Sequence, residues 1–120
     1  MQIRIQTQGF DLTPAIAAWT HERVAGALER FAHEVSSVDV YLKDINGPRG
    51  GDDKLALVRV QPRSAVPVFV ESTHSDLYAA IDRSSQRVKR SFRRMLKRRH
   101  RLALNGSRRL RRIDAIMAEL

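Results

Sequence analysis

The feature that most restricts the fold is a helical repeat of apolar or small residues that begins at Leu77. Its members recur every three, four or seven residues, which places them on one face of an α-helix. They are Leu77, Ile81, Ser84, Val88, Phe92, Met95 and Leu102. The opposite face holds a file of cations, spaced four and three residues apart: Arg83, Arg87, Arg90, Arg94, Lys97 and Arg101. The pattern predicts a helix over residues 76–104, with one side on a core and a line of positive charge about 27 Å long on the other.

This positive charge is concentrated in one segment. Residues 83–112 hold fourteen of the 22 Lys and Arg residues and no Asp or Glu. Like charges four residues apart on a helix cost about 0.2–0.5 kcal/mol per pair, and a bound polyanion would relieve that repulsion. We therefore predict a nucleic-acid surface rather than an ordinary solvated face. The predicted RNA contacts are Arg83, Arg87, Lys89, Arg90, Arg93, Arg94, Lys97, Arg98 and Arg101.

An anionic membrane is the main alternative partner for such a helix. Phe92 and Met95 argue against it, because they lie on the core-docking stripe and leave little apolar surface for a bilayer. No apolar run approaches the roughly 20 residues of a membrane span. A strand pattern begins directly at Met1, which leaves no room for a signal peptide. The absence of cysteine fits a reducing compartment, so we expect a cytoplasmic protein.

A chain of 120 residues has the size of one two-layer domain. Alternating or apolar patterns predict strands at residues 2–7, 38–43, 55–61 and 66–72, and Thr13-Pro14 starts a helix that ends near residues 32–34. In the order β-α-β-β-β-α, a right-handed crossover makes the first two strands parallel neighbours, and short turns make the last three an antiparallel meander. We therefore predict an α+β two-layer sandwich: a four-stranded mixed sheet, two helices on one face, and a second helix that overhangs the sheet.

Four local expectations accompany this fold. Pro67 places the last strand at an edge of the sheet or with its N–H position outward. The buried face of the third strand stays undecided, because both of its faces look apolar. Ser75 is expected to cap the long helix, with Asp76 in its first turn. Gly26 is expected to mark close packing of the first helix against another helix.

Three segments resemble a known family. They are residues 76–82 (DLYAAID), between a Val-Phe-Val-Glu strand and the basic helix, the opening Met-Gln-Ile-x-Ile, and Leu12-Thr13-Pro14-Ala15. Over about residues 1–101 the chain is similar to the ribosome hibernation-promoting factor and ribosome-associated inhibitor family. The resemblance implies the same β-α-β-β-β-α fold and binding to the small ribosomal subunit, between head and body, where mRNA and tRNA anticodon arms lie. It implies contact of the basic helix with rRNA and a block of translation under stress or in stationary phase.

Residues 105–120 are predicted to form a separate extension after a ribosome-binding domain of residues 1–104. Asn105-Gly106 is expected to end the long helix, and Ser107 to cap a short second one. So short a helix is marginal alone, so it folds back, pairs with a partner or stays disordered until RNA binds. Its apolar stripe is a candidate protein contact: Leu110, Ile113, Met117 and Leu120. Its cations are candidates for additional RNA or partner contacts: Arg108, Arg109, Arg111 and Arg112. The extension is far too short for the dimerising C-terminal domain of long family members, so ribosome dimerisation is not implied.

Catalytic patterns are not evident in the sequence. Asp76 and Asp82 stand six residues apart on a helix and do not face each other as an acid/base pair would. Gly50-Gly51 lacks the Lys-Ser/Thr of a phosphate-binding loop. No metal-ligand spacing relates the four histidines: His21, His33, His74 and His100. Tyr78 is interpreted as a ring at the core edge rather than a base-stacking group. We predict no enzyme activity, metal, cofactor or small-molecule substrate.

The predicted mechanism is electrostatic occupancy of an RNA cleft on the small ribosomal subunit. Arginine forks would hold phosphates, and the shape of the cleft would supply selectivity. Two alternatives stay open. One is a general structured or double-stranded RNA-binding module, which normally begins its last helix with cations, whereas this helix begins with Asp76 and Asp82. The other is an adaptor whose C-terminal helix recruits a protein partner.

Overall fold

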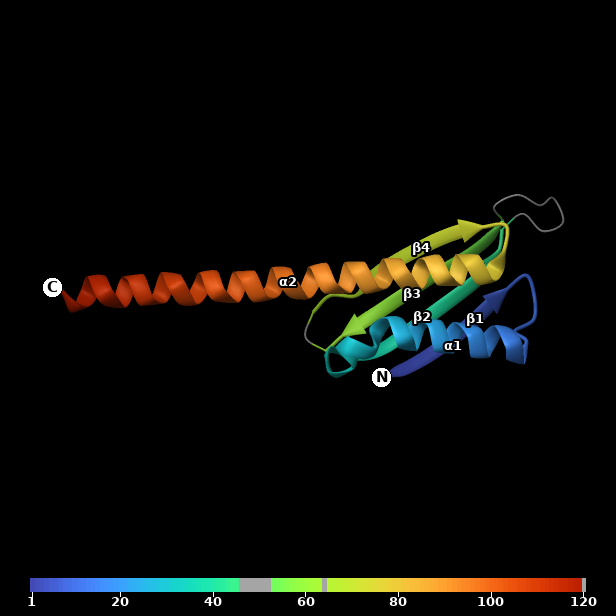
Figure 1. The fold of residues 1–120 in the computed structure, drawn as a ribbon, viewed down its shortest axis with the longest axis horizontal. Coiled ribbons are helices and arrows are strands. Elements are labelled where there is room, and N and C mark those ends of the chain that lie inside the picture. The colour runs from blue at the N-terminus through green and yellow to red at the C-terminus, as the bar shows by residue number, and fades with distance from the viewer. Residues whose placement is uncertain (46–52, 64, 120) are drawn as a thin grey trace.

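The computed structural model describes residues 1–45, 53–63 and 65–119, and it confirms the predicted order of elements (Figure 1). Six regular elements follow the β-α-β-β-β-α plan, with a short 3₁₀ helix (η1) after the first α-helix. Their bounds are β1 Gln2–Gln8, α1 Pro14–Leu28, η1 Glu29–Glu34, β2 Val35–Asp44, β3 Lys54–Pro62, β4 Val68–His74 and α2 Leu77–Ala118.

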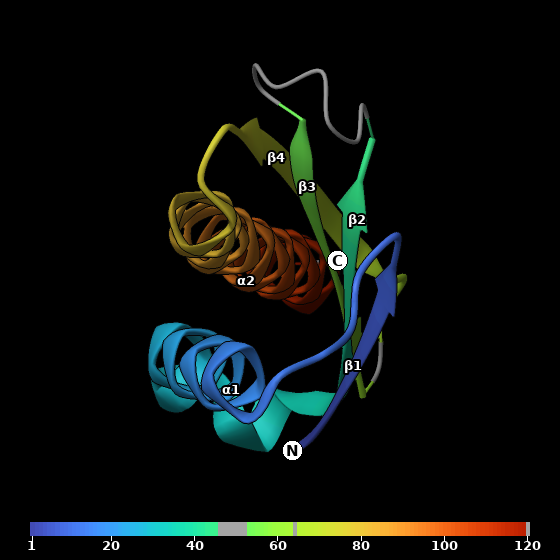
Figure 2. The ribbon, with the colours of Figure 1, turned by 90° about the vertical axis from the view of Figure 1, so that its right-hand side faces the viewer.

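The four strands form one sheet in the order β1-β2-β3-β4. β1 is parallel to β2, and the pairs β2–β3 and β3–β4 are antiparallel. Both helices cover the same face of this sheet, with α1 on the β1 side and α2 on the β4 side (Figure 2). The predicted α+β sandwich is therefore confirmed. β4 forms an edge of the sheet, but it starts at Val68, so Pro67 lies just before the strand and not within it as predicted.

The core lies between the sheet and the two helices. β3 turns Ala56, Val58 and Val60 inward, fully or almost fully buried, which settles the parity that the sequence left undecided. Leu55 and Leu57 therefore lie on the open face of the sheet, which no helix covers. The core consists of buried aliphatic side chains from every layer together with one aromatic ring: Val24, Leu28, Val35, Val38, Val40, Leu42, Ala56, Val58, Val60, Ala80, Ile81, Val88 and Phe92.

Helix α1 starts as predicted. Thr13 is its N-cap, and the Thr13 Oγ1 accepts a hydrogen bond from the Ile16 amide at 3.2 Å. The prediction for Gly26 is wrong, because a β-carbon at this position would meet no atom within 4 Å. Polar side chains such as Glu22 and Lys89 line the seam here and leave an open hollow of about 440 Å³ between α1 and α2. The two helices therefore do not approach closely at Gly26.

The start of α2 lies one residue later than predicted. Its N-cap is Asp76, whose Oδ1 accepts a hydrogen bond from the Tyr78 amide at 3.1 Å. Ser75 does not cap the helix; its hydroxyl lies 3.5 Å from His74 Nδ1. His74 Nδ1 also accepts a hydrogen bond from the Asp76 amide at 2.9 Å. A histidine at the end of β4 thus fixes the turn and presents the aspartate to the first free amides of the helix.

The predicted end of the long helix at Asn105-Gly106 is wrong. α2 runs without a break from Leu77 to Ala118. Glycine ends a helix when it adopts a left-handed conformation, and in the described residues only Gly9 has a positive φ, of 91°. Keeping Gly106 helical costs only about 1 kcal/mol relative to alanine, and the continuing backbone hydrogen bonds offset that cost. The assignment of a separate role to residues 105–120 stays a prediction.

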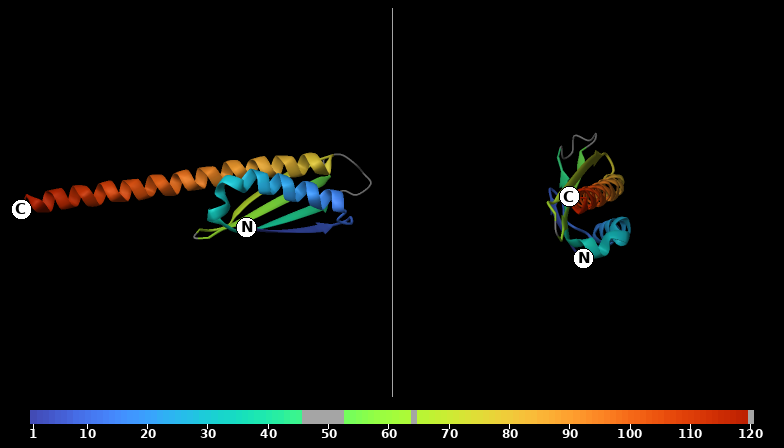
Figure 3. Two further views of the ribbon diagram at one scale, coloured as in Figure 1. Left: turned by 60° about the horizontal axis from the view of Figure 1, so that its bottom comes forward. Right: turned by 90° about the vertical axis from the view of Figure 1, so that its left-hand side faces the viewer.

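The predicted overhang of α2 is confirmed. Residues 97–119, here called the overhang, are all exposed and project beyond the sheet (Figures 1 and 3). The molecule measures 75 × 25 × 17 Å as a result. In the described part of the chain, no helix combines the length and apolarity that a membrane span requires.

Candidate nucleic-acid interface

The predicted RNA-binding residues form one ridge along α2, on the side away from the core. We call this set of nine the basic ridge. Eight of its members are exposed, and Lys89 is half-buried beside the α1 seam. The structure therefore brings the nine residues together on one rigid element. They are Arg83, Arg87, Lys89, Arg90, Arg93, Arg94, Lys97, Arg98 and Arg101.

Two members of the ridge also bind the protein itself. Arg83 Nη1 donates to the Thr73 carbonyl oxygen at 3.3 Å, and Arg87 Nη1 donates to the Glu71 carbonyl oxygen at 2.6 Å. Four residues of helix advance by about 6 Å, and two residues of strand by about 6.6 Å. The spacing of the two arginines therefore matches alternate carbonyl groups along the outer edge of β4. Each guanidinium carries five N–H donors, so donors remain for a phosphate.

Three acidic side chains of the sheet layer pair with cations of the globular body. Asp39 binds Arg4 and Arg59 on the open face of the sheet. At the base of the β2–β3 hairpin, Lys54 Nζ lies 2.9 Å from Asp44 Oδ2 and 3.3 Å from Asp53 Oδ2. The hydrogen bond that Lys54 Nζ donates to Asp44 is the main cause that raises the pKa of Lys54 above its ordinary value of 10.5. These three carboxylates lie in the sheet layer, away from the ridge.

Asp82, which belongs to the second turn of α2, points to α1 rather than to the ridge. Its Oδ1 accepts a hydrogen bond from Trp19 Nε1 at 3.0 Å and lies 3.5 Å from Arg23 Nε. The Arg23 guanidinium stacks over the Trp19 ring, 4.2 Å from its centroid, and Tyr78 meets the same ring edge-on at 5.3 Å. These contacts agree with the interpretation of Tyr78 as a ring at the core edge. They also dock the first turns of α2 firmly on α1.

A groove between α2 and the edge strand offers a place for phosphates. It holds about 450 Å³ and is lined by Val70, Glu71, Arg87, Arg90, Ser91 and Arg94. Three arginines thus stand beside a single acidic residue, and Arg87 is already oriented by the edge carbonyl. Guanidinium groups in this arrangement favour bidentate contact with phosphate oxygens.

The unbroken helix adds the overhang cations to the same ridge. Arg101, Arg108 and Arg112 follow Arg94 at intervals of seven, seven and four residues, which keeps them on one face of α2. Arg109 and Arg111 lie to either side of this line. From Arg83 to Arg112 the cationic face extends for about 44 Å at 1.5 Å per residue. The sequence predicts residues 76–104 and 105–120 as separate segments, because Asn105-Gly106 is expected to end the helix.

Two groups of residues fall outside the ridge. In the described part of the chain, no three His, Asp or Glu residues gather as metal ligands would. Gly50-Gly51 lies outside the described residues.

Two aromatic residues of the open sheet face were not predicted from the sequence. Tyr41 and Phe69 are both exposed there. Alternation with the buried Val40 and Leu42 was the available signal for Tyr41.

The fold and the ridge define a class: a small α+β domain whose long second helix carries a cationic surface suited to a polyanion. Comparison with family models identifies the class further. Residues 3–100 match the family described as Sigma 54 modulation protein / S30EA ribosomal protein, and the chain belongs to this family. Membership confirms the resemblance to hibernation-promoting factors. The family comprises ribosome-associated modulation proteins and is not a known enzyme class.

Solved structures agree with this assignment. The N-terminal domain of Protein Y from Thermus thermophilus matches with a TM-score of 0.65 and 25% sequence identity, over 79% of this chain and 99% of that one. A ribosomal subunit interface protein from Coxiella burnetii matches in fold with a TM-score of 0.66 and 17% identity, over 81% of this chain and 99% of that one. Comparison with curated protein sequences finds no match.

Proposed function

We propose that this protein binds the small ribosomal subunit through rRNA phosphates and sterically blocks the mRNA and tRNA sites. In this way it inhibits translation, or protects idle ribosomes, in the cytoplasm during stress or stationary phase. One observation carries the proposal: a member of a ribosome-associated family presents an exposed, acid-free cationic ridge on a rigid helix. The relative from Coxiella burnetii is itself described as a ribosomal subunit interface protein.

The mechanism follows from the rigidity of the ridge. Helix α2 docks on the sheet through buried Val88 and Phe92, so its outward cations are fixed relative to one another before RNA binds. Such preorganisation lowers the entropy lost on association. Phosphate contacts supply affinity and orientation but little sequence information. Selectivity for the ribosome would therefore come from shape: the domain would fit a particular rRNA cleft whose walls carry phosphates.

The overhang favours a second role beside RNA binding, that of an adaptor. Leu110, Ile113, Ile116 and Met117 are exposed on the face of α2 that continues the core stripe. An apolar stripe without a cover is typical of a partner-binding helix. Deletion of residues 105–120 separates the two roles. An adaptor would keep its ribosome affinity and lose a partner, whereas an RNA clamp would lose affinity.

The general double-stranded RNA module finds less support. Such a module begins its last helix with cations, and here Asp76 caps that helix while Asp82 binds Trp19 and Arg23. Equal affinity for a plain RNA duplex and for small subunits would nevertheless favour it over the proposed function.

Cosedimentation with purified small subunits tests the proposal. Arg90→Gln combined with Arg94→Gln removes two ridge charges, and we expect at least a roughly tenfold loss of affinity, because each lost phosphate contact weakens electrostatic binding. Arg30→Glu is the matched control: it lowers the net charge by the same two units, at an exposed position in η1. The control should bind like the wild-type protein. Equal losses in both variants would show that only net charge matters, and an unchanged ridge variant would place the interface elsewhere.

A further inference from the structure

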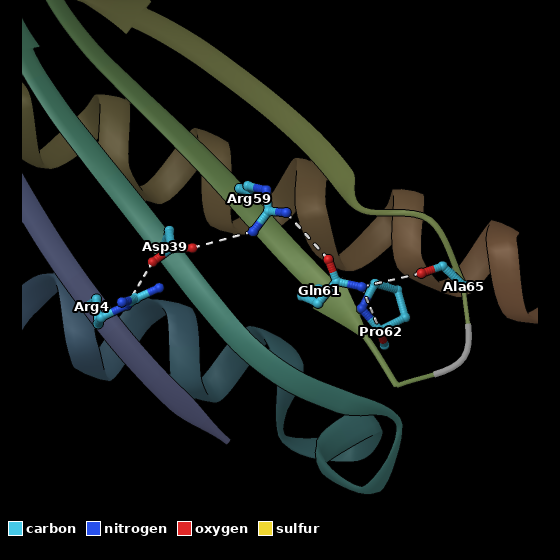
Figure 4. A network of polar contacts seen from close by, with 6 residues as sticks. All are labelled: Arg4, Asp39, Arg59, Gln61, Pro62 and Ala65. Carbon is cyan, nitrogen blue, oxygen red and sulfur yellow. Dashed lines mark hydrogen bonds and ion pairs between the residues drawn. The ribbon is translucent and has the colours of Figure 1, made fainter.

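The open face of the sheet carries chemistry that the ridge does not use. Figure 4 shows this face with the two helices behind it. Across its strands, Arg4, Asp39, Arg59 and Phe69 stand in one row, each paired in register with the next. Arg4 Nε donates to Asp39 Oδ1 at 3.0 Å, and Arg59 Nη1 donates to Asp39 Oδ2 at 3.4 Å. Two arginines share one carboxylate, so the row keeps one positive charge that the carboxylate does not balance.

An exposed aromatic ring ends this row. Phe69 is 59% exposed, and the Arg59 guanidinium carbon lies 5.8 Å from the centroid of its ring. Arg59 is held in place by Asp39 and by Gln61 Oε1, to which its Nη2 donates at 3.3 Å. A phenyl ring left in water beside a fixed guanidinium offers two planar groups on which a base can stack.

Beside the row lies a hollow of about 410 Å³ on the same face. Leu55 and Leu57 line it from β3, and Tyr41, which is 38% exposed, lines it from β2. The amide side chains of Gln6 and Gln8 line the β1 side. Lys43, which is exposed, lies at the end farther from the Arg4–Asp39–Arg59 row. The hollow thus combines apolar side chains, an aromatic ring, amide donors and acceptors, and a cation.

We propose that this hollow binds an unpaired nucleotide of a single-stranded RNA segment. The base packs on Leu57 and the Tyr41 ring, the amides of Gln6 and Gln8 read its polar edge, and Lys43 binds the phosphate. Phe69 and Arg59 stack the neighbouring base. This inference deepens the proposed function and rests on it for the choice of RNA: the ridge binds phosphates on one side of the wedge, and the open face binds bases on the other.

The charges and the sheet edge favour RNA over other ligands. Lys43 lies at one end of the hollow, and the Arg4–Asp39–Arg59 row, which carries one unbalanced positive charge, lies at the other, where they can meet successive phosphates. Exposed Glu71, in register with Leu57, is the acidic neighbour on the β4 side. A peptide that extends a sheet needs free edge groups, and at the β4 edge the carbonyls of Glu71 and Thr73 already accept hydrogen bonds from Arg87 and Arg83. Exposed aromatic side chains on an open sheet are a common platform for unpaired bases.

The test compares Tyr41→Ala with Leu12→Ala, because both side chains are 38% exposed in the folded protein. The probe is a fluorescein-labelled hexaadenylate, followed by anisotropy at fixed salt, with a short RNA duplex as second probe. Loss of one stacked base should weaken hexaadenylate binding by Tyr41→Ala roughly 5- to 100-fold. Binding of the duplex, and both affinities of Leu12→Ala, should stay within twofold of wild type. Equal affinity of Tyr41→Ala and wild type for hexaadenylate would overturn the inference.

A second measurement uses the unmodified protein, so it does not depend on the folding of a variant. Hexaadenylate should shift the backbone amide signals of Gln6, Lys43 and Leu57. Shifts confined to α2 would refute the site. Adenosine monophosphate should not compete at equal nucleotide concentration, and full competition would identify a free nucleotide as the ligand instead. Cosedimentation with small subunits distinguishes the two proposals: the ridge variant tests the proposed function, and Tyr41→Ala tests only the hollow.

Discussion

Arg87 Nη1 donates a hydrogen bond of 2.6 Å to the carbonyl oxygen of Glu71, so one ridge arginine also closes the outer edge of the sheet. Arg83 makes the corresponding contact with the Thr73 carbonyl oxygen one helical turn earlier. Exposed strand edges invite pairing with other chains, and charged side chains over the edge prevent it. The first part of the ridge is therefore structural as well as electrostatic, and variants there would confuse loss of stability with loss of RNA binding.

Arg87→Met should lower the free energy of unfolding by about 1 kcal/mol, because it removes one donor to a main-chain carbonyl while keeping an apolar stem. Urea denaturation followed by Trp19 fluorescence measures the change. Arg94→Met is the matched control, since Arg94 is an exposed ridge residue farther along α2. Equal stability of the two variants would mean that the edge contact contributes nothing.

Binding to small subunits should depend steeply on salt. If six to ten cations of the ridge neutralise phosphates, raising the salt from about 50 to 200 mM should weaken binding roughly 10³- to 10⁵-fold. A plot of log affinity against log salt should lose roughly 0.9 of slope for each phosphate contact removed. Arg90→Gln with Arg94→Gln should therefore bind with a shallower slope. A nearly flat response of the wild-type protein would refute phosphate contacts as the main source of affinity.

Gly106→Ala should stabilise the overhang without affecting the globular body. A β-carbon at this position meets no atom within 4 Å, so the substitution adds no clash. The gain in helix propensity is about 1 kcal/mol, which corresponds to roughly fivefold slower amide exchange in the following turns. Hydrogen exchange of residues 107–117 measures this effect. Gly106→Pro should do the opposite, and no response to either substitution would show that the overhang is not helical in solution.

The ion pairs at the base of the β2–β3 hairpin should make stability depend on pH at the alkaline end. Folding raises the pKa of Lys54, chiefly through its hydrogen bond with Asp44. A raised pKa stabilises the fold fully below the unfolded value of 10.5, and this contribution disappears as the pH rises through the folded pKa. Lys54→Met should therefore be less stable than wild type at pH 8, and the difference should shrink above pH 10.5. A difference that is constant from pH 8 to pH 11.5 would contradict this role.

The strands, the helices and their layer arrangement could be predicted because the apolar periods are local and mutually consistent. Thr13 also behaved as its local chemistry indicates. The failures at Ser75, Gly26 and Gly106 have a common physical cause. A cap, a close approach and a helix end each depend on which groups lie nearby in the folded chain. These were His74 for the cap, the polar side chains between α1 and α2 for Gly26, and the continuing helix for Gly106.

By itself, the sequence determined the class of fold, the acid-free cationic face and the family resemblance. Each of these depends on residues that are close together along the chain. Only the tertiary structure showed that Arg83 and Arg87 bind the edge of β4, that the cations on both sides of Gly106 form one ridge, and that Tyr41 lines a hollow with Leu57. These relationships join residues from different strands and helices. Their positions are fixed by packing and strand register, which a local pattern does not contain.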